Sequence, residues 1–449
     1  MLSRTLFKYL VYYPVTFAKG ERVARHLSQY RRQQYFSREA LCDYQRRHLM
    51  RLLEHASKHS SHYRHRLEAS ITALRSGSSP EEALTQAPFL TKSELIAQRG
   101  SIGTYSRLWS SKKTTGGSTG EPVTLFKNPD ALARERAATW RSYEWAGISI
   151  GDVQVRFWGV PHSLLGRRKA QLTDLLSNRV RVSAFQLQED SIAEHYARIA
   201  SLRPTYLYGY VSAIVALAQY IKDRGLPSVR SIRAVITTSE LLSPAARRLI
   251  SGSFEAHVFN EYGCGEVGSI AHECEHGTLH TMADNLIVEV DSGTSNGSIG
   301  ELIVTDLFNF STPLIRYRLG DFSSANLIQC QCGRTLPAIG EIRGRAYDLI
   351  HLRSGRVLHP EALMYILESI QQRTSAFRQF QIVQESLDRF TVRLVPNGVL
   401  SADTASAIIA EFHQHVSATA FVDVVRVTDL PREPSGKMRV VKSQVSRIS

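Results

Sequence analysis

The sequence predicts an α/β fold: a large N-terminal domain with parallel sheets and a β-rich subdomain, followed by a small α+β C-terminal domain. Three observations support this prediction. The 449 residues exceed what one ordinary hydrophobic core holds, so about two or three domains are expected. Short apolar runs alternate with helical patterns over much of the chain, which is typical of a parallel sheet. The pattern then changes twice, past Thr281 and near Gly344.

A helical pattern comes first. From about Arg38 to Leu67, apolar residues recur at the i, i+3, i+4, i+7 spacing of an amphipathic helix. The strand and helix patterns that follow alternate as they do in α/β domains. Buried strands are predicted over residues 153–160 and 234–238, and helices over residues 130–145 and 191–199.

Short strands and turns mark the later part of the chain. Strand patterns at residues 286–290 and 301–305 flank a turn-rich connection, which predicts a β-rich part over residues 270–343. The predicted domains are residues 1–343, with a helical start over 1–70, and residues 344–449. In the second domain, helices are predicted over 360–372 and 402–416, and strands over 380–383, 390–395 and 422–427.

The composition is that of a folded protein, with 43% hydrophobic and 21% charged residues. The net charge of +14 suits polyanionic ligands such as nucleotides, coenzyme A or an acidic carrier protein. No nucleic-acid recognition motif accompanies this charge, so we expect no nucleic acid partner. The five cysteines do not make a disulfide framework, and a reducing cytoplasmic compartment is expected.

The first twenty residues combine cations with apolar and aromatic residues. Their apolar run extends only from Tyr9 to Ala18 and contains Pro14, so it is too short to span a bilayer. No signal-peptide cleavage pattern follows it cleanly. We therefore expect a soluble protein, with weak association to a membrane surface left open. A homodimer is also left open.

A Gly/Ser/Thr-rich loop is the sharpest local signal for chemistry. Its glycines let the backbone turn several N–H groups toward one anion, and its hydroxyl groups add donors. The loop lacks the Lys-Ser/Thr pair of a Walker A motif. The alternative interpretation is a plain surface turn. The loop residues are Thr114, Thr115, Gly116, Gly117, Ser118, Thr119 and Gly120.

A second segment covers residues 260–268 and follows the apolar pair Val258–Phe259. It is therefore predicted at the C-terminal edge of a strand, where α/β sheets bind ligands. Glu266 is suited to hold Mg²⁺, which bridges phosphate oxygens and offsets their charge. A solvent-exposed loop glutamate is the alternative. The segment also contains Glu261, Tyr262 and Gly263.

Three further positions stand in short polar motifs. Asp321, in the segment 316–321, can accept both hydroxyls of a ribose, and Arg345 can bind phosphate or ribose oxygens with its planar fork. Each of these is more often part of a surface ion pair. Lys437 lies on a Pro/Gly-rich loop over residues 430–438, where a lysine is normally just solvated.

Cysteine and histidine residues in the β-rich part suggest a metal. Cys274 is followed by His276 and His280, and Cys330 and Cys332 come some fifty residues later. Three thiolates and one imidazole can close a tetrahedral Zn²⁺ site with no open position, which is a structural site. His280 is the preferred nitrogen ligand and His276 is the competitor. The alternative is a set of unrelated reduced cysteines in a core.

The order and separation of these five segments resemble the superfamily of acyl-CoA synthetases, peptide-synthetase adenylation domains and luciferases. Within it the chain is similar to the branch of phenylacetate–coenzyme A ligases and capsular-polysaccharide-type adenylating proteins. The resemblance extends roughly from Tyr105 to Lys437. It implies ATP, Mg²⁺ and coenzyme A as ligands, a cysteine-rich zinc site of the kind found in this branch, and a small mobile C-terminal domain that acts as a lid.

The resemblance also implies roles for individual residues. The loop Thr114–Gly120 matches the phosphate loop, and Glu266 matches the Mg²⁺ ligand. The other matches are Tyr262 and Gly263 beside the adenine, Asp321 on the ribose, Arg345 at the domain junction and Lys437 as the adenylation lysine. Two departures concern the nucleotide segment and the junction. Cys264-Gly265 stands where many relatives have a residue followed by Thr, and Tyr347 stands where many have the first of two acidic residues.

The implied reaction has two halves. A carboxylate attacks the α-phosphate of ATP, pyrophosphate leaves, and the acyl-adenylate then passes its acyl group to a thiol, with coenzyme A as the expected acceptor. An amide ligase, or an enzyme that loads a carrier protein in polysaccharide or natural-product biosynthesis, is the alternative. A nucleotide-binding member without turnover is the third reading. The small acid is unidentified, although five residues are candidates for either an aromatic pocket or the core: Trp140, Tyr143, Phe157, Trp158 and Tyr208.

Overall fold

The computed structural model describes most of the chain. The described residues are 3–104, 110–114, 123–159, 164–184, 189–293, 299–326, 330–343, 350–354, 357–358, 360–398, 401–430 and 439–445. They form two compact units. The first comprises Met1–Leu319 and Ser323–Glu341, and the second comprises Gly320–Phe322 and Ile342–Ser449. No described helix is long and apolar enough to cross a membrane.

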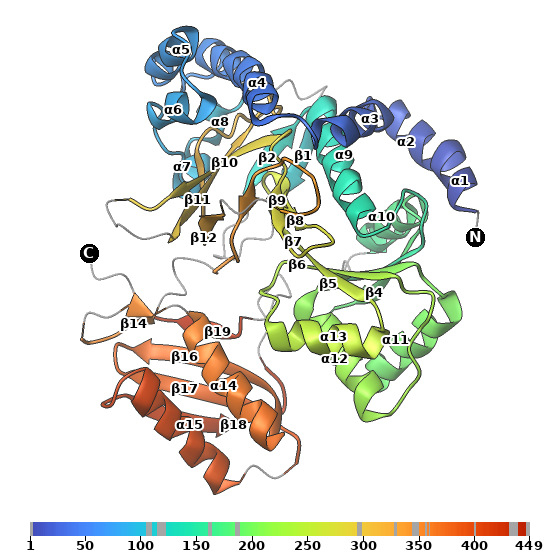
Figure 1. Cartoon of the computed structure of the whole chain (residues 1–449), viewed down its shortest axis with the longest axis vertical. Helices are drawn as coiled ribbons and strands as arrows, with labels where there is room; N and C mark the ends of the chain where they lie inside the picture. Colours follow the sequence, from blue (N-terminus) through green and yellow to red (C-terminus); the bar gives the residue numbers. More distant parts are fainter. Residues whose placement is uncertain are drawn as a thin grey trace. The chain divides into compact units, whose positions relative to one another are not determined.

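In the first unit, a series of helices precedes the first strand (Figure 1). In the longest of them, the Ser37 hydroxyl accepts a hydrogen bond from the Ala40 N–H, and the predicted apolar stripe from Leu49 to Ala56 is buried. The bounds of these helices are α1 Arg4–Leu6, η1 Phe7–Tyr12 (a π-helical stretch), α2 Tyr13–Ala18, α3 Val23–Gln33, α4 Arg38–His59, α5 Glu68–Arg75, α6 Pro80–Thr85, α7 Lys92–Ala97 and α8 Arg99–Ile102.

Strands and helices then alternate, as the sequence predicts. The strands β3, β4, β5, β6 and β7 pair in parallel, and apolar residues of α11, α12 and α13 cover one face of this parallel group. The bounds are β1 Ser111–Thr114, β2 Thr124–Lys127, α9 Pro129–Trp145, β3 Gln154–Trp158, α10 Leu164–Leu175, β4 Arg179–Ser183, α11 Glu189–Leu202, β5 Tyr206–Tyr210, α12 Val211–Asp223, β6 Ala234–Thr238, α13 Pro244–Phe254 and β7 His257–Cys264.

The β-rich part continues the same sheet instead of forming a separate one. Among the described residues the sheet has eleven strands in the order β10-β11-β12-β13-β9-β8-β7-β6-β5-β3-β4. β7 pairs in parallel with β6 on one side and antiparallel with β8 on the other, so the sheet changes its pairing at this strand. The added bounds are β8 Gly268–Glu273, β9 Leu279–Thr281, β10 Leu286–Asp291, β11 Ile299–Asp306, β12 Tyr317–Asn326 and β13 Ala338–Ile339.

The two faces of the parallel strands have separate cores. Phe157 packs with apolar residues of α11 and α12 on one face. Tyr143 of α9 packs with Tyr206 and Tyr208 on the opposite face. The faces differ because successive side chains of a strand point to opposite sides of the sheet. Helix α9 is also tied to the antiparallel half of the sheet by a fully buried ion pair, in which Arg141 Nη1 lies 3.1 Å from Asp284 Oδ2.

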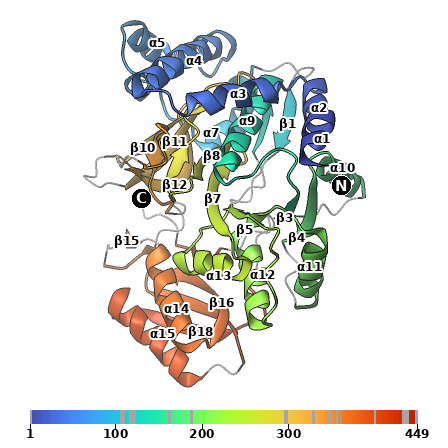
Figure 2. The same ribbon diagram turned by 45° about the vertical axis from the view of Figure 1, so that its right-hand side comes forward.

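The second unit is a four-stranded sheet with two helices. Its strand order is β18-β17-β16-β19, and α14 and α15 pack against the sheet and against each other (Figure 2). The Phe390 and Phe412 rings meet in its core, with centroids 5.6 Å apart. The bounds are β14 Ile350–His351, β15 Val357–Leu358, α14 Pro360–Thr374, β16 Phe377–Ser386, β17 Arg389–Pro396, α15 Ala402–His415, β18 Phe421–Arg426 and β19 Val441–Ser443. The predicted fold class is confirmed.

Candidate nucleotide site and metal cluster

The predicted phosphate loop connects two short antiparallel strands. Residues 111–114 of β1 pair with 124–127 of β2, and Thr114 lies opposite Thr124 at the loop end of this hairpin. Thr114 is exposed on β1. The other predicted loop residues, Thr115, Gly116, Gly117, Ser118, Thr119 and Gly120, lie outside the described residues. The described strands β1 and β2 hold the two ends of this loop.

A buried ionic network holds both of these strands to helix α9. Lys113 of β1 donates to Glu135 Oε1 at 2.9 Å, and Lys127 of β2 donates to Glu135 Oε2 at 2.8 Å. Lys127 is 1% exposed and also lies 3.6 Å from Asp306 Oδ2. Burial alone would raise the pKa of Glu135, but the two lysines hold that pKa at about 2. Glu135 therefore stays ionised and fixes the strands on both sides of the predicted phosphate loop.

The same network reaches the turn that carries the predicted magnesium ligand. Lys127 Nζ donates to the Val267 carbonyl at 3.2 Å, next to the buried Glu266. Gly268 follows with φ +95°, and a Cβ atom there would come within 2.5 Å of the Glu135 carboxyl carbon. Only glycine fits this position, because it tolerates positive φ and leaves room for Glu135. The network thus joins the strands beside the predicted phosphate loop to the Glu266 turn.

We expect Glu135→Gln to lower both stability and ATP affinity. The substitution leaves the buried Lys127 short of one counter-charge, and breaking a buried ion pair in this way costs about 3–5 kcal/mol. Urea unfolding and ATP titration calorimetry measure the two effects. Glu144→Gln on the same helix is the matched control, because its partner Arg31 is substantially exposed and such pairs contribute about 0–1 kcal/mol. Equal effects of the two substitutions would contradict the assigned role.

Glu261, Tyr262 and Gly263 lie within β7, because the strand continues beyond the apolar pair that predicts it. The Tyr143 hydroxyl donates to Glu261 Oε2 at 2.9 Å. Burial raises the pKa of Glu261 to about 7, and the Tyr143 hydrogen bond opposes this rise only in part. The backbone around Gly263 is tight, since a Cβ atom there would lie 3.0 Å from the Ser269 Cα.

The raised pKa of Glu261 predicts a pH dependence of stability. Between its ordinary value of about 4.5 and about 7, the folded chain holds a proton that the unfolded chain has lost. This contribution to the free energy of unfolding is therefore full below that window and is lost as pH rises through it. We expect Glu261→Gln to remove this loss, so its stability advantage over the wild type should grow from pH 5 to pH 8.

Chemical unfolding of both proteins across this pH range measures the difference. Glu54→Gln serves as the control for removal of an exposed glutamate, since Glu54 pairs with Arg75 on the surface. A constant difference between wild type and Glu261→Gln from pH 5 to pH 8 would refute the prediction.

The remaining predicted nucleotide ligands are Asp321, Arg345 and Lys437. Asp321 is buried in β12 and belongs to the three residues of that strand that group with the second unit. Arg345 and Lys437 lie outside the described residues. Their roles therefore stay predictions.

Four predicted metal ligands come together at one end of the antiparallel half of the sheet. Single ligand atoms of Cys274, His280, Cys330 and Cys332 all lie within 4.8 Å of one another. The Cys274 and Cys330 sulfurs are 3.5 Å apart, and His280 Nε2 is 3.3 Å from the Cys332 sulfur. Zn–S bonds of about 2.3 Å place two sulfurs of one tetrahedron roughly 3.7 Å apart. The three thiols and one imidazole therefore fit a closed zinc site.

The surroundings of the cluster also suit a structural metal. His280 Nδ1 lies 2.9 Å from the Leu336 carbonyl, which leaves Nε2 to face the sulfurs as the ligand atom. Burial raises the pKa of the Cys274 thiol. Burial also acts to raise the pKa of the neighbouring Cys330, but hydrogen bonds lower it to about 6, so this thiol of the pair favours the thiolate. The competing residue, His276, contributes its backbone N–H to the Cys274 sulfur at 3.4 Å.

The aromatic candidates for an acyl pocket do not all share one face. Tyr143 and Tyr208 belong to the cluster under α9, with Trp140 packed against it, whereas Phe157 lies in the core on the other side of the sheet. Trp158 is partly buried and packs against both clusters. Phe157 is therefore a core residue and not part of the aromatic cluster under α9.

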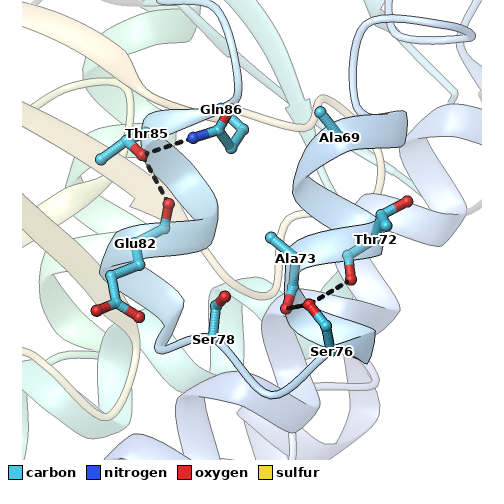
Figure 3. Close-up of a pocket in the computed structure, with 8 residues that line it drawn as sticks. All are labelled: Ala69, Thr72, Ala73, Ser76, Ser78, Glu82, Thr85 and Gln86. Carbon is cyan, nitrogen blue, oxygen red and sulfur yellow. Dashed lines mark hydrogen bonds between the residues drawn. The ribbon is translucent and has the colours of Figure 1, made fainter.

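A surface cavity of about 830 Å³ lies elsewhere, between α5 and α6 (Figure 3). Two of its hydroxyl groups are turned to the local backbone: Ser76 donates to the carbonyls of Thr72 and Ala73, and Thr85 donates to that of Glu82. It gathers one carboxylate and no cation, so it offers no counterpart to the phosphates of a nucleotide.

The comparisons with known proteins agree with the fold. Residues 354–444 match the family described as the CapK C-terminal domain. Protein CapK from Staphylococcus aureus is 24% identical over 360 residues, which are 79% of this chain and 79% of that protein. A phenylacetate–coenzyme A ligase from Thermus thermophilus is 26% identical over 275 residues. That match covers 54% of this chain and 61% of the relative, so the chain spans less than two thirds of it.

The solved structures define the class of the fold. A 2-hydroxyisobutyryl-CoA ligase, in the postadenylation state with an acyl-AMP, aligns with a TM-score of 0.74 and 18% identity over 93% of this chain and 92% of that one. The chain thus has the fold of AMP-forming CoA ligases. The relatives include both CapK and a phenylacetate–coenzyme A ligase, which confirms the resemblance to the branch that contains these two kinds of protein.

Proposed function

We propose that the protein activates a small carboxylic acid with ATP, forming an acyl-adenylate and releasing pyrophosphate. One observation carries the proposal: the five motifs occur in the order and spacing of adenylate-forming enzymes within a chain that has the fold of AMP-forming CoA ligases. The likeness to CapK and to the Thermus phenylacetate–coenzyme A ligase supports it.

The residues divide the work of the first half-reaction. Backbone N–H groups and hydroxyls of Thr114–Gly120 bind the phosphates, and Asp321 accepts the ribose hydroxyls. Glu266 would hold Mg²⁺, which would supply positive charge to offset that of the phosphate oxygens. A carboxylate oxygen of the acid then attacks the α-phosphorus, and the bond to pyrophosphate breaks. Lys437 stabilises the negative charge that gathers between the acid and the α-phosphate.

The second half-reaction transfers the acyl group to a thiol. The sulfur attacks the acyl carbon, AMP leaves with the bonding electron pair, and the thiol proton is released. We propose coenzyme A as the acceptor, supported by the net charge of +14 and by the name of the Thermus relative. An amine or a carrier-protein thiol is the second candidate, because the relative that matches the larger share of the chain is CapK, which is not described as a CoA ligase.

The acid is proposed to be an aryl or arylacetic acid. Trp140 and Trp158 are only partly buried at the edge of the aromatic cluster under α9, next to the buried Tyr143 and Tyr208. Aromatic side chains in this arrangement suit an aromatic ligand because rings pack favourably edge-to-face or offset. Glu261 lies at the same cluster, and its raised pKa leaves it largely protonated and uncharged in slightly acidic solution. An uncharged Glu261 does not attract a cationic ring, so a neutral ring is favoured.

The cysteine and histidine cluster is proposed to bind one structural Zn²⁺ through Cys274, His280, Cys330 and Cys332. Its ligands come from β9 and from the segments after β8 and before β13, so the metal ties the turns of this part of the sheet together. The cysteines are all free thiols in the structure, in keeping with the proposed cytoplasmic location.

ATP–pyrophosphate exchange tests the function. The panel contains aryl, arylacetic, fatty and hydroxy acids, followed by addition of coenzyme A, a carrier protein or amines to the acid that responds. Exchange that depends on one acid class establishes adenylation and names the substrate. Product formation with only one acceptor then identifies the second half-reaction. ATP binding without exchange for any acid would count for the non-catalytic reading.

A further inference from the structure

Exposed apolar side chains are concentrated on one part of the first unit. Among the described residues, eight large hydrophobic side chains are exposed, and six of them lie on the opening helical segment or on α10. Their exposed fractions range from 48% to 71%. These six residues, here called the apolar patch, are Leu6, Tyr9, Leu10, Phe17, Leu172 and Leu175.

The opening helical segment is anchored to the first unit by its opposite face. Phe7, Tyr12 and Thr16 are buried, and the Trp140 indole N–H donates to the Tyr12 hydroxyl at 2.7 Å. Arg136 Nε lies 2.7 Å from the buried Glu21 just after the segment. The segment therefore presents a fixed apolar face to the outside instead of lying loosely on the surface.

Helix α10 extends the patch beside this segment. Both views draw α10 next to α1 (Figures 1 and 2). Gly151 connects them: a Cβ atom added there would collide with the Arg4 carbonyl oxygen, and the Gly151 carbonyl accepts a hydrogen bond from Asn178 Nδ2 at 2.6 Å, just after α10. Leu172 and Leu175 are exposed on the last turn of this neighbouring helix.

The charged residues of the opening segment itself are all cations, and of these Arg4 lies 3.9 Å from Asp152. Arg4, Lys8 and Lys19 are the charged residues of the opening segment, and no acidic residue occurs between Ser3 and Gly20. Lys8 lies over the rings of Tyr9 and Tyr13, at 5.3 and 5.7 Å from their centroids. A second copy of this face would bring like charges together, whereas an anionic surface would be attracted. Charge therefore favours an anionic occupant over a dimer contact.

We propose that the apolar patch docks the protein on the surface of an anionic lipid bilayer. The leucine and phenylalanine side chains enter the boundary between headgroups and acyl chains, and the lysine and arginine side chains contact lipid phosphates. Tyr9 and Tyr13 suit the interface because one end of a tyrosine ring is apolar and the other is polar. The helical segment lies in the plane of the surface. This proposal does not depend on the proposed function.

Vesicle flotation tests the proposal with the full chain. Neutral vesicles contain phosphatidylcholine only, and anionic vesicles contain phosphatidylcholine with phosphatidylglycerol. We expect binding to anionic vesicles that weakens with salt, and a drop of roughly tenfold or more in the bound fraction for Leu10→Glu/Phe17→Glu, since apolar area drives insertion. Phe421→Glu is the matched control, because Phe421 is 57% exposed on β18 of the other unit. Circular dichroism verifies folding.

A second variant keeps the test independent of folding. Lys8→Glu/Lys19→Glu leaves the apolar residues in place, and we expect it to lose the preference for anionic vesicles. The proposal is overturned if the wild type binds neither kind of vesicle, or if Phe421→Glu loses as much binding as the double variant at positions 10 and 17. It is also overturned if light scattering shows that the wild type is a dimer and Leu10→Glu/Phe17→Glu a monomer, while the wild type does not bind vesicles. That last result would assign the patch to a second copy.

Discussion

Lys437→Ala is expected to abolish ATP–pyrophosphate exchange while leaving thioester formation from a preformed acyl-adenylate largely intact. The lysine cation is proposed to stabilise charge that develops only while the acid and the α-phosphate react. Removal of one such electrostatic contact costs on the order of 10²- to 10³-fold in rate. In the second half-reaction the pyrophosphate charge is gone, so the cation has less to stabilise. Exchange assays and single-turnover transfer from synthetic acyl-AMP measure the two halves separately.

Lys442→Ala is the matched control for this prediction. Lys442 is an exposed lysine on β19, a few residues further along the same segment. Its substitution removes the same charge from the same region, and we expect exchange to stay near the wild-type rate. If Lys437→Ala and Lys442→Ala slow exchange equally, the effect belongs to general charge and not to a catalytic lysine. If Lys437→Ala slows both half-reactions alike, the division of labour proposed for this residue is wrong.

The second large effect is expected from Cys332→Ser. We expect the wild type to carry one zinc ion per chain and this variant to carry much less, because the three thiolates and one imidazole act as a set. Structural metal sites contribute directly to folding free energy. A loss of several kcal/mol would lower the melting temperature by roughly 10 °C. Elemental analysis and thermal unfolding, with and without a chelator, measure the two quantities.

Cys42→Ser controls for the general effect of removing a thiol. Cys42 is a partly exposed free cysteine on α4 that is absent from the cluster. We expect it to keep its zinc and its response to the chelator. His276→Ala adds a second comparison, since the His280 ring and not that of His276 faces the sulfurs. Wild-type protein without bound zinc after purification in zinc-containing buffer would contradict the metal assignment.

Strands and helices with strong local patterns could be predicted from the sequence. The strand predicted over residues 234–238 coincides with β6, because both faces of this central strand are buried and its residues are apolar or small. The helix predicted from residue 130 begins at Pro129, where a proline at the first helical position sets the backbone angle. The C-terminal helix predicted from residue 402 coincides at its start with α15, where Ser401 caps the helix.

Features that depend on distant pairing could not be predicted. The β-rich part continues the parallel sheet because β8 pairs with β7, and nothing in the local pattern of either strand states this partner. In the sequence, nothing distinguishes Glu135 from the other glutamates that lie in predicted helices. Its importance comes from Lys113 and Lys127, which the β1–β2 hairpin carries to the same carboxylate. The cysteine and histidine cluster could be predicted because the spacing of these residues carries its own chemical signal.

Strand β4 stands at one end of the eleven-stranded sheet, and its position has a consequence for solubility. An end strand offers unpaired backbone groups to which a strand of another molecule can add. In β4 two arginines, Arg179 and Arg181, alternate with apolar residues, and both pair with Asp174. Charged side chains on an end strand disfavour such addition. We therefore expect Arg179 and Arg181 to limit intermolecular extension of this sheet.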